Sequence, residues 1–92
     1  MQQGIYKVPN GKLLKIFLET EDGKIKTLKI TGDFFIHPEE KITALEAALI
    51  SEPLDEKTLR AKLQTIIDKE SLELFGVDAE SIAKTILLAH QT

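Results

Sequence analysis

Cysteine is absent from this 92-residue chain, so it forms no disulfide, holds no metal through thiolates and has no cysteine nucleophile. The sequence also lacks a run of about 18 apolar residues, the length that crosses a membrane as a helix. Its first residues lack the basic-then-apolar order of a signal peptide. We therefore expect a cytoplasmic protein without membrane contact. The length and the 42% hydrophobic content predict a single domain over residues 1–92.

Residues that carry out catalysis or bind metals are sparse. The two histidines, His37 and His90, have no histidine, cysteine or well-placed carboxylate pair at the spacing of a metal site. No serine lies in a Gly-x-Ser-x-Gly motif, and the five glycines are too scattered to form a phosphate-binding loop. The sequence predicts no catalytic residue, no metal site and no nucleotide site formed by this chain alone.

Charge divides the chain at Gly32. Residues 1–32 carry six lysines and three acidic residues, a net charge of +3, whereas residues 33–92 carry six basic and twelve acidic residues, a net charge of −6. Lysines on strands often face solvent, where they discourage pairing of sheet edges. They also make a basic surface that can meet an anionic ligand or an acidic partner, and both interpretations stay open at this point.

Two strands and a turn are predicted near the amino terminus. Residues 5–8 form a short strand, and residues 9–11 combine proline, asparagine and glycine, which is typical of a hairpin turn. Apolar residues then alternate over 13–19, so one face of this second strand belongs to the core. Leu13 and Phe17 fall on the opposite face, where we expect either a partner or the first strand to cover them.

A second hairpin is predicted at residues 22–23, an Asp-Gly pair that leads into a third strand over residues 25–31. The later apolar residues of this strand share one face, whereas Ile25 is out of phase with them. A β-bulge near Lys26 or Thr27 would return Ile25 to the same face.

Three helices follow the strands. The first has Pro38 in its first turn and ends near Ile50. The second is capped by Asp55 and ends around Lys69, and the third is capped by Asp78.

Strands first and helices after, with no βαβ alternation, predict an α+β fold. We expect a three-stranded antiparallel meander followed by three helices packed on one face of the sheet. Between the last two helices, residues 72–75 form an apolar cluster before Gly76, which is predicted to be a helix stop.

The segment of residues 30–40, which joins the last strand to the first helix, contains more than a connection needs. Gly32 permits close approach of backbones, Asp33 adds a charge, and Phe34 and Phe35 are adjacent aromatics. Strand alternation implies that about one of the two rings faces inward. The segment is therefore a candidate for contact with something outside the chain.

Three segments carry a resemblance to a known family. Residues 7–13 read Lys-Val-Pro-Asn-Gly-Lys-Leu, residues 21–25 read Glu-Asp-Gly-Lys-Ile, and residues 30–40 read Ile-Thr-Gly-Asp-Phe-Phe-Ile-His-Pro-Glu-Glu. In this order they resemble the carboxy-terminal accessory domain of lipoate-protein ligases. The similarity continues through residues 45–49, 55–67 and 75–82, and so covers nearly the whole chain.

In that family a larger domain, similar to biotin ligases, binds lipoate and ATP and carries the catalytic lysine, and the small domain supports formation of lipoyl-adenylate. The resemblance therefore implies the non-catalytic small subunit of a bipartite lipoate-protein ligase, in which a heterodimer with the catalytic subunit must form before lipoate is activated. Lipoate, ATP and Mg²⁺ are expected on the partner subunit and not on this chain alone. Lipoyl-acceptor domains are expected to be partners only indirectly.

The residues expected to contact the partner or the adenylate are Lys7, Lys12, Gly32, Asp33, Phe34, Phe35 and His37. One of the two phenylalanines would be an aromatic anchor, and Asp33 would fix orientation. The lysines would approach either the partner or the phosphates of the nucleotide, and both roles stay open. His37 is either a junction residue or a hydrogen-bond donor to the partner.

The alternative is a stand-alone module that binds a nucleic acid or a scaffold protein through its basic sheet face. The acidic total charge of −3 and the lack of an arginine cluster argue against nucleic acid.

Overall fold

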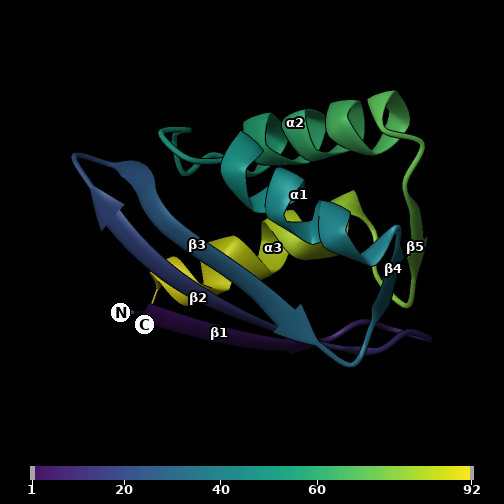
Figure 1. Cartoon of the computed structure of the whole chain (residues 1–92). Helices are drawn as coiled ribbons and strands as arrows, with labels where there is room; N and C mark the ends of the chain where they lie inside the picture. Colours follow the sequence, from purple (N-terminus) through teal and green to yellow (C-terminus); the bar gives the residue numbers. More distant parts are fainter. Residues whose placement is uncertain (1, 92) are drawn as a thin grey trace.

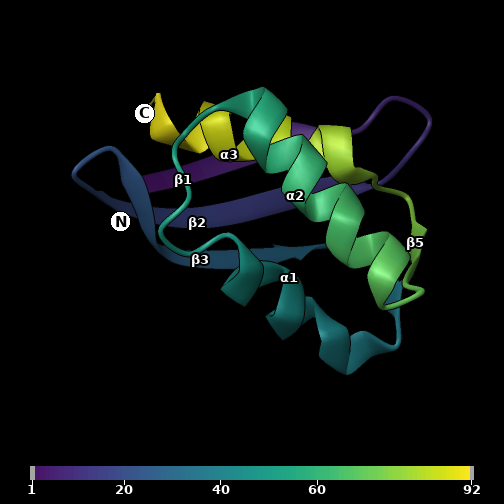
Figure 2. The ribbon, with the colours of Figure 1, turned by 90° about the horizontal axis from the view of Figure 1, so that it is seen from above.

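The computed structural model describes residues 2–91 and shows helices covering one face of a three-stranded sheet (Figures 1 and 2). The sheet consists of β1 (Gln2–Lys7), β2 (Leu13–Glu21) and β3 (Lys24–Gly32), antiparallel in the order β1-β2-β3. The predicted α+β class and the antiparallel meander are therefore confirmed. The first strand starts earlier than Ile5, because its pairing with β2 continues back to Gln2.

The pairing of β2 with β3 contains the predicted bulge. Its register shifts between Glu19 and Thr20, which leaves Lys26 without a counterpart on β2. The extra residue returns Ile25 to the core face, where only 1% of its surface is exposed. The tight hairpin at residues 22–23 is also confirmed, since both residues have the positive φ of a two-residue hairpin turn.

The helical layer comprises a 3-10 turn, η1 (Glu39–Lys41), and the helices α1 (Ile42–Ala48), α2 (Glu56–Lys69) and α3 (Ala79–His90). Helix α3 lies against β1 and β2, α2 packs on α3, and α1 contacts both α2 and β3 (Figure 2). Gly4 permits the close approach of α3 to β1, because a side chain at Gly4 would lie 2.8 Å from the carbonyl oxygen of Thr85. The predicted packing of helices on one face is confirmed.

The predicted starts of the second and third helices are confirmed by their caps. The Asp55 carboxylate accepts a hydrogen bond from the backbone N–H of Thr58 (2.9 Å) at the start of α2. At the start of α3, Asp78 and Ser81 each accept a hydrogen bond from the other's backbone N–H, which is a reciprocal capping box.

The first helix differs in detail from its prediction. Pro38 caps the 3-10 turn η1, and regular α-helix begins only at Ile42 and ends at Ala48. The peptide bond between His37 and Pro38, just before η1, is cis. Within residues 2–91, no helix is long and apolar enough to cross a membrane.

The core lies between the sheet and the helices. Its largest fully buried apolar side chains are Leu14, Ile16, Leu18, Ile25, Leu45, Leu49, Leu59, Leu63, Ile82 and Ile86. They come from β2, β3, the three α-helices and the residue that follows α1.

A second, two-stranded sheet had no counterpart in the sequence prediction. β4 (Phe35–His37) pairs antiparallel with β5 (Glu73–Phe75), and we call these two strands the ribbon. The prediction of Gly76 as a helix stop is wrong, because α2 ends at Lys69 and Gly76 follows β5. Strands of three residues are too short to show periodicity, and their partner is far away in the sequence.

Candidate docking site

Three connections meet at one end of the molecule: the β1–β2 turn, the corner between β3 and β4, and the link from β5 to α3 (Figure 1). The backbone N–H of Lys12 donates to the carbonyl of Gly76 (3.0 Å), and the N–H of Asp33 donates to the carbonyl of Leu13 (3.0 Å). The β1–β2 turn is thus tied to both of the other connections. Backbone hydrogen bonds thus join segments that are far apart in the sequence at one end of the molecule.

Two glycines permit this close packing. Gly32 has φ +147 and Gly76 has φ +92, values that L side chains rarely adopt. A side chain at Gly32 would meet the carbonyl oxygen of Leu13, and one at Gly76 would meet the side chain of Lys12. The sequence prediction that Gly32 serves a close backbone approach is confirmed.

An aromatic pair projects from the ribbon. Phe35 lies directly opposite Phe75 in the β4–β5 register, and their exposed fractions are 69% and 53%. Ile36 and Leu74, the pair next to them, point to the other side and are buried and half-buried. Two adjacent exposed rings form an apolar patch of the kind that marks contact surfaces. Sequence reasoning missed Phe75, because only the long-range pairing brings it beside Phe35.

Three charged side chains lie on the segments that meet at this end. Lys7 lies opposite Leu13 in the β1–β2 register, and Lys7, Lys12 and Asp33 are exposed. In the described part of the chain none of these three charged side chains has a hydrogen bond or ion pair. We define the docking end as the seven residues Lys7, Lys12, Leu13, Gly32, Asp33, Phe35 and Phe75.

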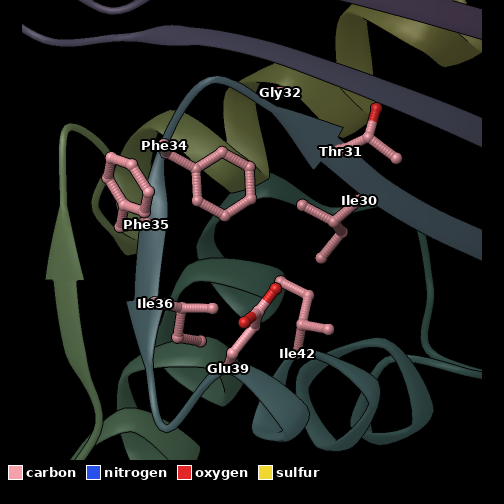
Figure 3. Close-up of a pocket in the computed structure, with 8 residues that line it drawn as sticks. All are labelled: Ile30, Thr31, Gly32, Phe34, Phe35, Ile36, Glu39 and Ile42. Carbon is pink, nitrogen blue, oxygen red and sulfur yellow. The ribbon is translucent and has the colours of Figure 1, made fainter.

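Beside the docking end lies an open hollow of about 300 Å³ (Figure 3). Its lining residues are Ile30, Thr31, Gly32, Phe34, Phe35, Ile36, Glu39 and Ile42. The ring of Phe34 and the carboxylate of Glu39 point toward the same space. Phe34 is half-buried and packs against the core, whereas Phe35 is exposed, so the expected division of the two rings is confirmed.

His37 lies opposite Glu73 at the far end of the ribbon and is exposed. It is two residues from Phe35, so it projects from the same face of β4. Within residues 2–91, no group of three or more histidine, aspartate and glutamate side chains is arranged to hold a metal ion.

The carboxylate that caps α2 accepts two hydrogen bonds from one residue. The hydroxyl of Thr58 donates to the Asp55 carboxylate (2.7 Å), and the backbone N–H of Thr58 donates to the same oxygen. These two hydrogen bonds hold the pKa of Asp55 below its usual value. The same hydrogen bonds stabilise the start of α2.

The outer face of the β1-β2-β3 sheet is left open by the helices (Figures 1 and 2). Ile5 pairs with Lys15, and Phe17 lies between Gln3 and Lys29. Ile5 is 54% exposed, and the ammonium of Lys15 lies 5.2 Å from the centre of the Phe17 ring. This face is basic with apolar residues between the lysines, as the sequence indicated, and strand β1 does not cover Phe17.

The fold is that of a small α+β domain whose loops and ribbon come together at one exposed end. Residues 6–86 match the family model described as bacterial lipoate protein ligase C-terminus, and the chain belongs to this family. The resemblance found in the sequence is thereby confirmed.

A solved structure has a similar fold. It comes from a structural analysis of an archaeal lipoylation system, a bipartite lipoate protein ligase and its E2 lipoyl domain from Thermoplasma acidophilum. The similar chain has a TM-score of 0.73 and 22% sequence identity, over 92% of this chain and 90% of that chain. No curated protein matches this sequence.

Proposed function

We propose that this chain is the non-catalytic small subunit of a bipartite lipoate-protein ligase. In this role it binds a separate catalytic subunit through the docking end, and the heterodimer activates lipoate with ATP to lipoyl-adenylate and pyrophosphate. The observation that carries the proposal is the exposed Phe35–Phe75 pair, in a domain of the lipoate-ligase C-terminal family. The similar archaeal chain, which comes from a bipartite ligase, supports it.

The aromatic pair has the chemistry of an interface anchor. Large rings that are exposed in the free chain lose the most water-accessible apolar area on binding, and aromatic residues are enriched among binding hot spots. Lys12 and Lys7 beside them would steer an acidic partner surface, and Asp33 would select its orientation. The backbone hydrogen bonds that join the segments of this end would lower the ordering cost of association.

Lipoate, ATP and Mg²⁺ belong to the catalytic subunit in this proposal, and lipoyl-acceptor domains are reached only through it. The small subunit acts by holding the catalytic subunit in the conformation that activates lipoate. Lys7 and Lys12 have a second possible role, contact with the phosphates of the nucleotide. ATP would then tighten the complex, whereas partner contact alone predicts the same affinity with and without ATP.

The direct test mixes the two purified chains and measures both co-elution and pyrophosphate release from ATP and lipoate. We expect a one-to-one complex and much faster pyrophosphate release than from the catalytic chain alone. Equal rates with and without this chain would refute the accessory role. Transfer of preformed lipoyl-adenylate to an acceptor domain is expected to proceed on the catalytic chain alone.

A second candidate function is binding of an acidic scaffold protein on the outer sheet face. The specific observation is that Ile5, which is 54% exposed, and Phe17 lie there among lysines. Phe17→Ala together with Lys15→Glu would abolish that binding and leave the ligase complex intact. If those two substitutions disrupt the ligase complex while Phe35→Ala does not, the sheet face is the docking surface instead.

A further inference from the structure

We propose that the hollow beside Phe34 is a socket for an arginine side chain of the catalytic subunit. This inference rests on the proposed function, because it names a contact within the same complex. The hollow and the docking end share Gly32 and Phe35, so a partner seated on the aromatic pair lies next to the hollow. The chemistry of the lining residues then determines which kind of side chain binds in the hollow.

The walls are apolar and one carboxylate faces the space. Ile30 and Ile42 lie on one side of the hollow, the ring of Phe34 lies across from them, and the carboxylate of Glu39 lies beside Ile42 (Figure 3). In the described chain Glu39 has no ion pair or hydrogen bond through its side chain. The nearest lysine in the sequence, Lys41, is held by Glu70 at 3.0 Å. The carboxylate is therefore available to an external cation.

A basic side chain fits this lining better than an anion does. A phosphate or carboxylate of a ligand would be repelled by the carboxylate of Glu39, which is exposed to the hollow. A volume of about 300 Å³ is at the low end of the range for small-molecule sites, which suits one long side chain better than a nucleotide.

Arginine can interact with both the aromatic ring and the carboxylate of the hollow. Its methylene stem would lie on the isoleucine side chains while its charged end reaches Glu39. The planar guanidinium stacks on an aromatic ring and binds a carboxylate with two parallel hydrogen bonds, which a lysine ammonium does not do. The ring of Phe34 and the Glu39 carboxylate supply these two partners from opposite sides of the hollow.

A strand of the partner cannot pair with the edge of β3 beside the hollow. The edge of β3 that borders the hollow is closed by α1, because the N–H of Ile30 donates to the Glu46 carboxylate at 2.7 Å. Earlier along the same edge, Ile25 exchanges backbone hydrogen bonds with residues 51 and 52. A side chain, and not a strand, is the element that fits here.

The test compares Glu39→Gln with Glu40→Gln in titrations of this chain into the catalytic chain. Glu40 is the neighbouring exposed glutamate, does not line the hollow, and uses only its carbonyl to accept from Thr43. We expect Glu39→Gln to raise the dissociation constant about tenfold or more, since a charge-assisted hydrogen bond is lost. Glu40→Gln should stay within about twofold of wild type, the usual range for a charge at the rim of an interface.

Arginine is then identified on the partner by a double-mutant cycle. Each exposed arginine of the catalytic chain is replaced by alanine and titrated against wild type and Glu39→Gln. We expect one arginine whose loss weakens binding to wild type about tenfold and has little further effect on Glu39→Gln. Circular dichroism and the melting temperature verify that every variant is folded.

The outcomes separate the two proposals. Equal binding by Glu39→Gln, Glu40→Gln and wild type, with Phe35→Ala weakened, overturns the socket and leaves the proposed function standing. Coupling of Glu39 to no arginine also overturns the socket. Failure of wild type to bind the catalytic chain at all overturns both.

Discussion

Phe35 and Phe75, separated by 40 positions in the sequence, lie directly opposite each other in the β4–β5 ribbon and are both exposed. The pair exists only because β5 returns from the end of α2 to β4. Its neighbours on the inner side, Ile36 and Leu74, hold the ribbon against the core. The ribbon therefore presents its rings on a fixed support, which is what an interface anchor requires.

Removing either ring should weaken the complex without unfolding the chain. We expect Phe35→Ala and Phe75→Ala each to raise the dissociation constant for the catalytic chain at least tenfold, because interface anchors lose about 2 kcal/mol or more on truncation. Isothermal titration calorimetry measures this effect. Phe17→Ala, on the outer sheet face, is the control and should bind as wild type does. If Phe17→Ala weakens binding as much as Phe35→Ala does, the interface lies on the outer sheet face instead.

Charge reversal at Lys12 should slow association. We expect Lys12→Glu to lower the association rate about tenfold at low salt, and the difference should shrink as the ionic strength rises. Stopped-flow measurements at two salt concentrations provide the test. Lys26→Glu, in the bulge of β3 and outside the docking end, is the matched control. A salt-independent defect in Lys12→Glu would indicate a lost contact and not lost steering.

Gly32→Ala should destabilise the chain more than Gly23→Ala does. Both glycines have positive φ, but a side chain at Gly32 also meets the carbonyl of Leu13, whereas nothing lies within 4 Å of one at Gly23. We expect Gly32→Ala to lower the free energy of unfolding by about 1–3 kcal/mol, and Gly23→Ala to stay near the lower end of that range. Urea denaturation measures both values. If both substitutions lower the free energy of unfolding equally, the contact with the Leu13 carbonyl adds nothing to the effect of Gly32→Ala.

The cap at Asp55 predicts a pH dependence of stability. Hydrogen bonds from Thr58 lower the pKa of Asp55 in the folded chain, so the unfolded chain binds the proton more readily. The stabilisation is complete above the unfolded pKa of about 3.9 and is lost as the pH falls through the folded pKa. We expect wild type to melt above Asp55→Asn at pH 7 and the gap to narrow below about pH 4. A gap that stays constant from pH 7 to pH 3 would contradict this account.

Much of the fold follows from patterns within single elements. Alternation along β2, the Asp-Gly turn and the capping residues Asp55 and Asp78 were enough to predict the meander and two of the helices. Even the bulge was predictable, because Ile25 could reach the core in no other way. Each of these signals depends on neighbours in the chain.

The candidate site was predictable only in part. The segment of residues 30–40 pointed to Gly32 and Phe35, and both lie at the docking end. Phe75 carried no signal of its own, since a ring before a glycine near a helix end has many local explanations. The hollow with Glu39 was equally invisible, because the macrodipole of the predicted helix already explained an acidic residue in its first turn.

The sequence alone was sufficient for the three-stranded sheet, the starts of the second and third helices and the family, because periodicity, caps and turn residues act over a few positions. The tertiary structure alone brought Phe75 beside Phe35, joined Gly76 to Lys12 and placed Glu39 opposite Phe34. These contacts join residues whose local sequences do not depend on one another. They form only when the helices pack on the sheet and so bring β5 next to β4. Burial of the shared apolar core drives this packing.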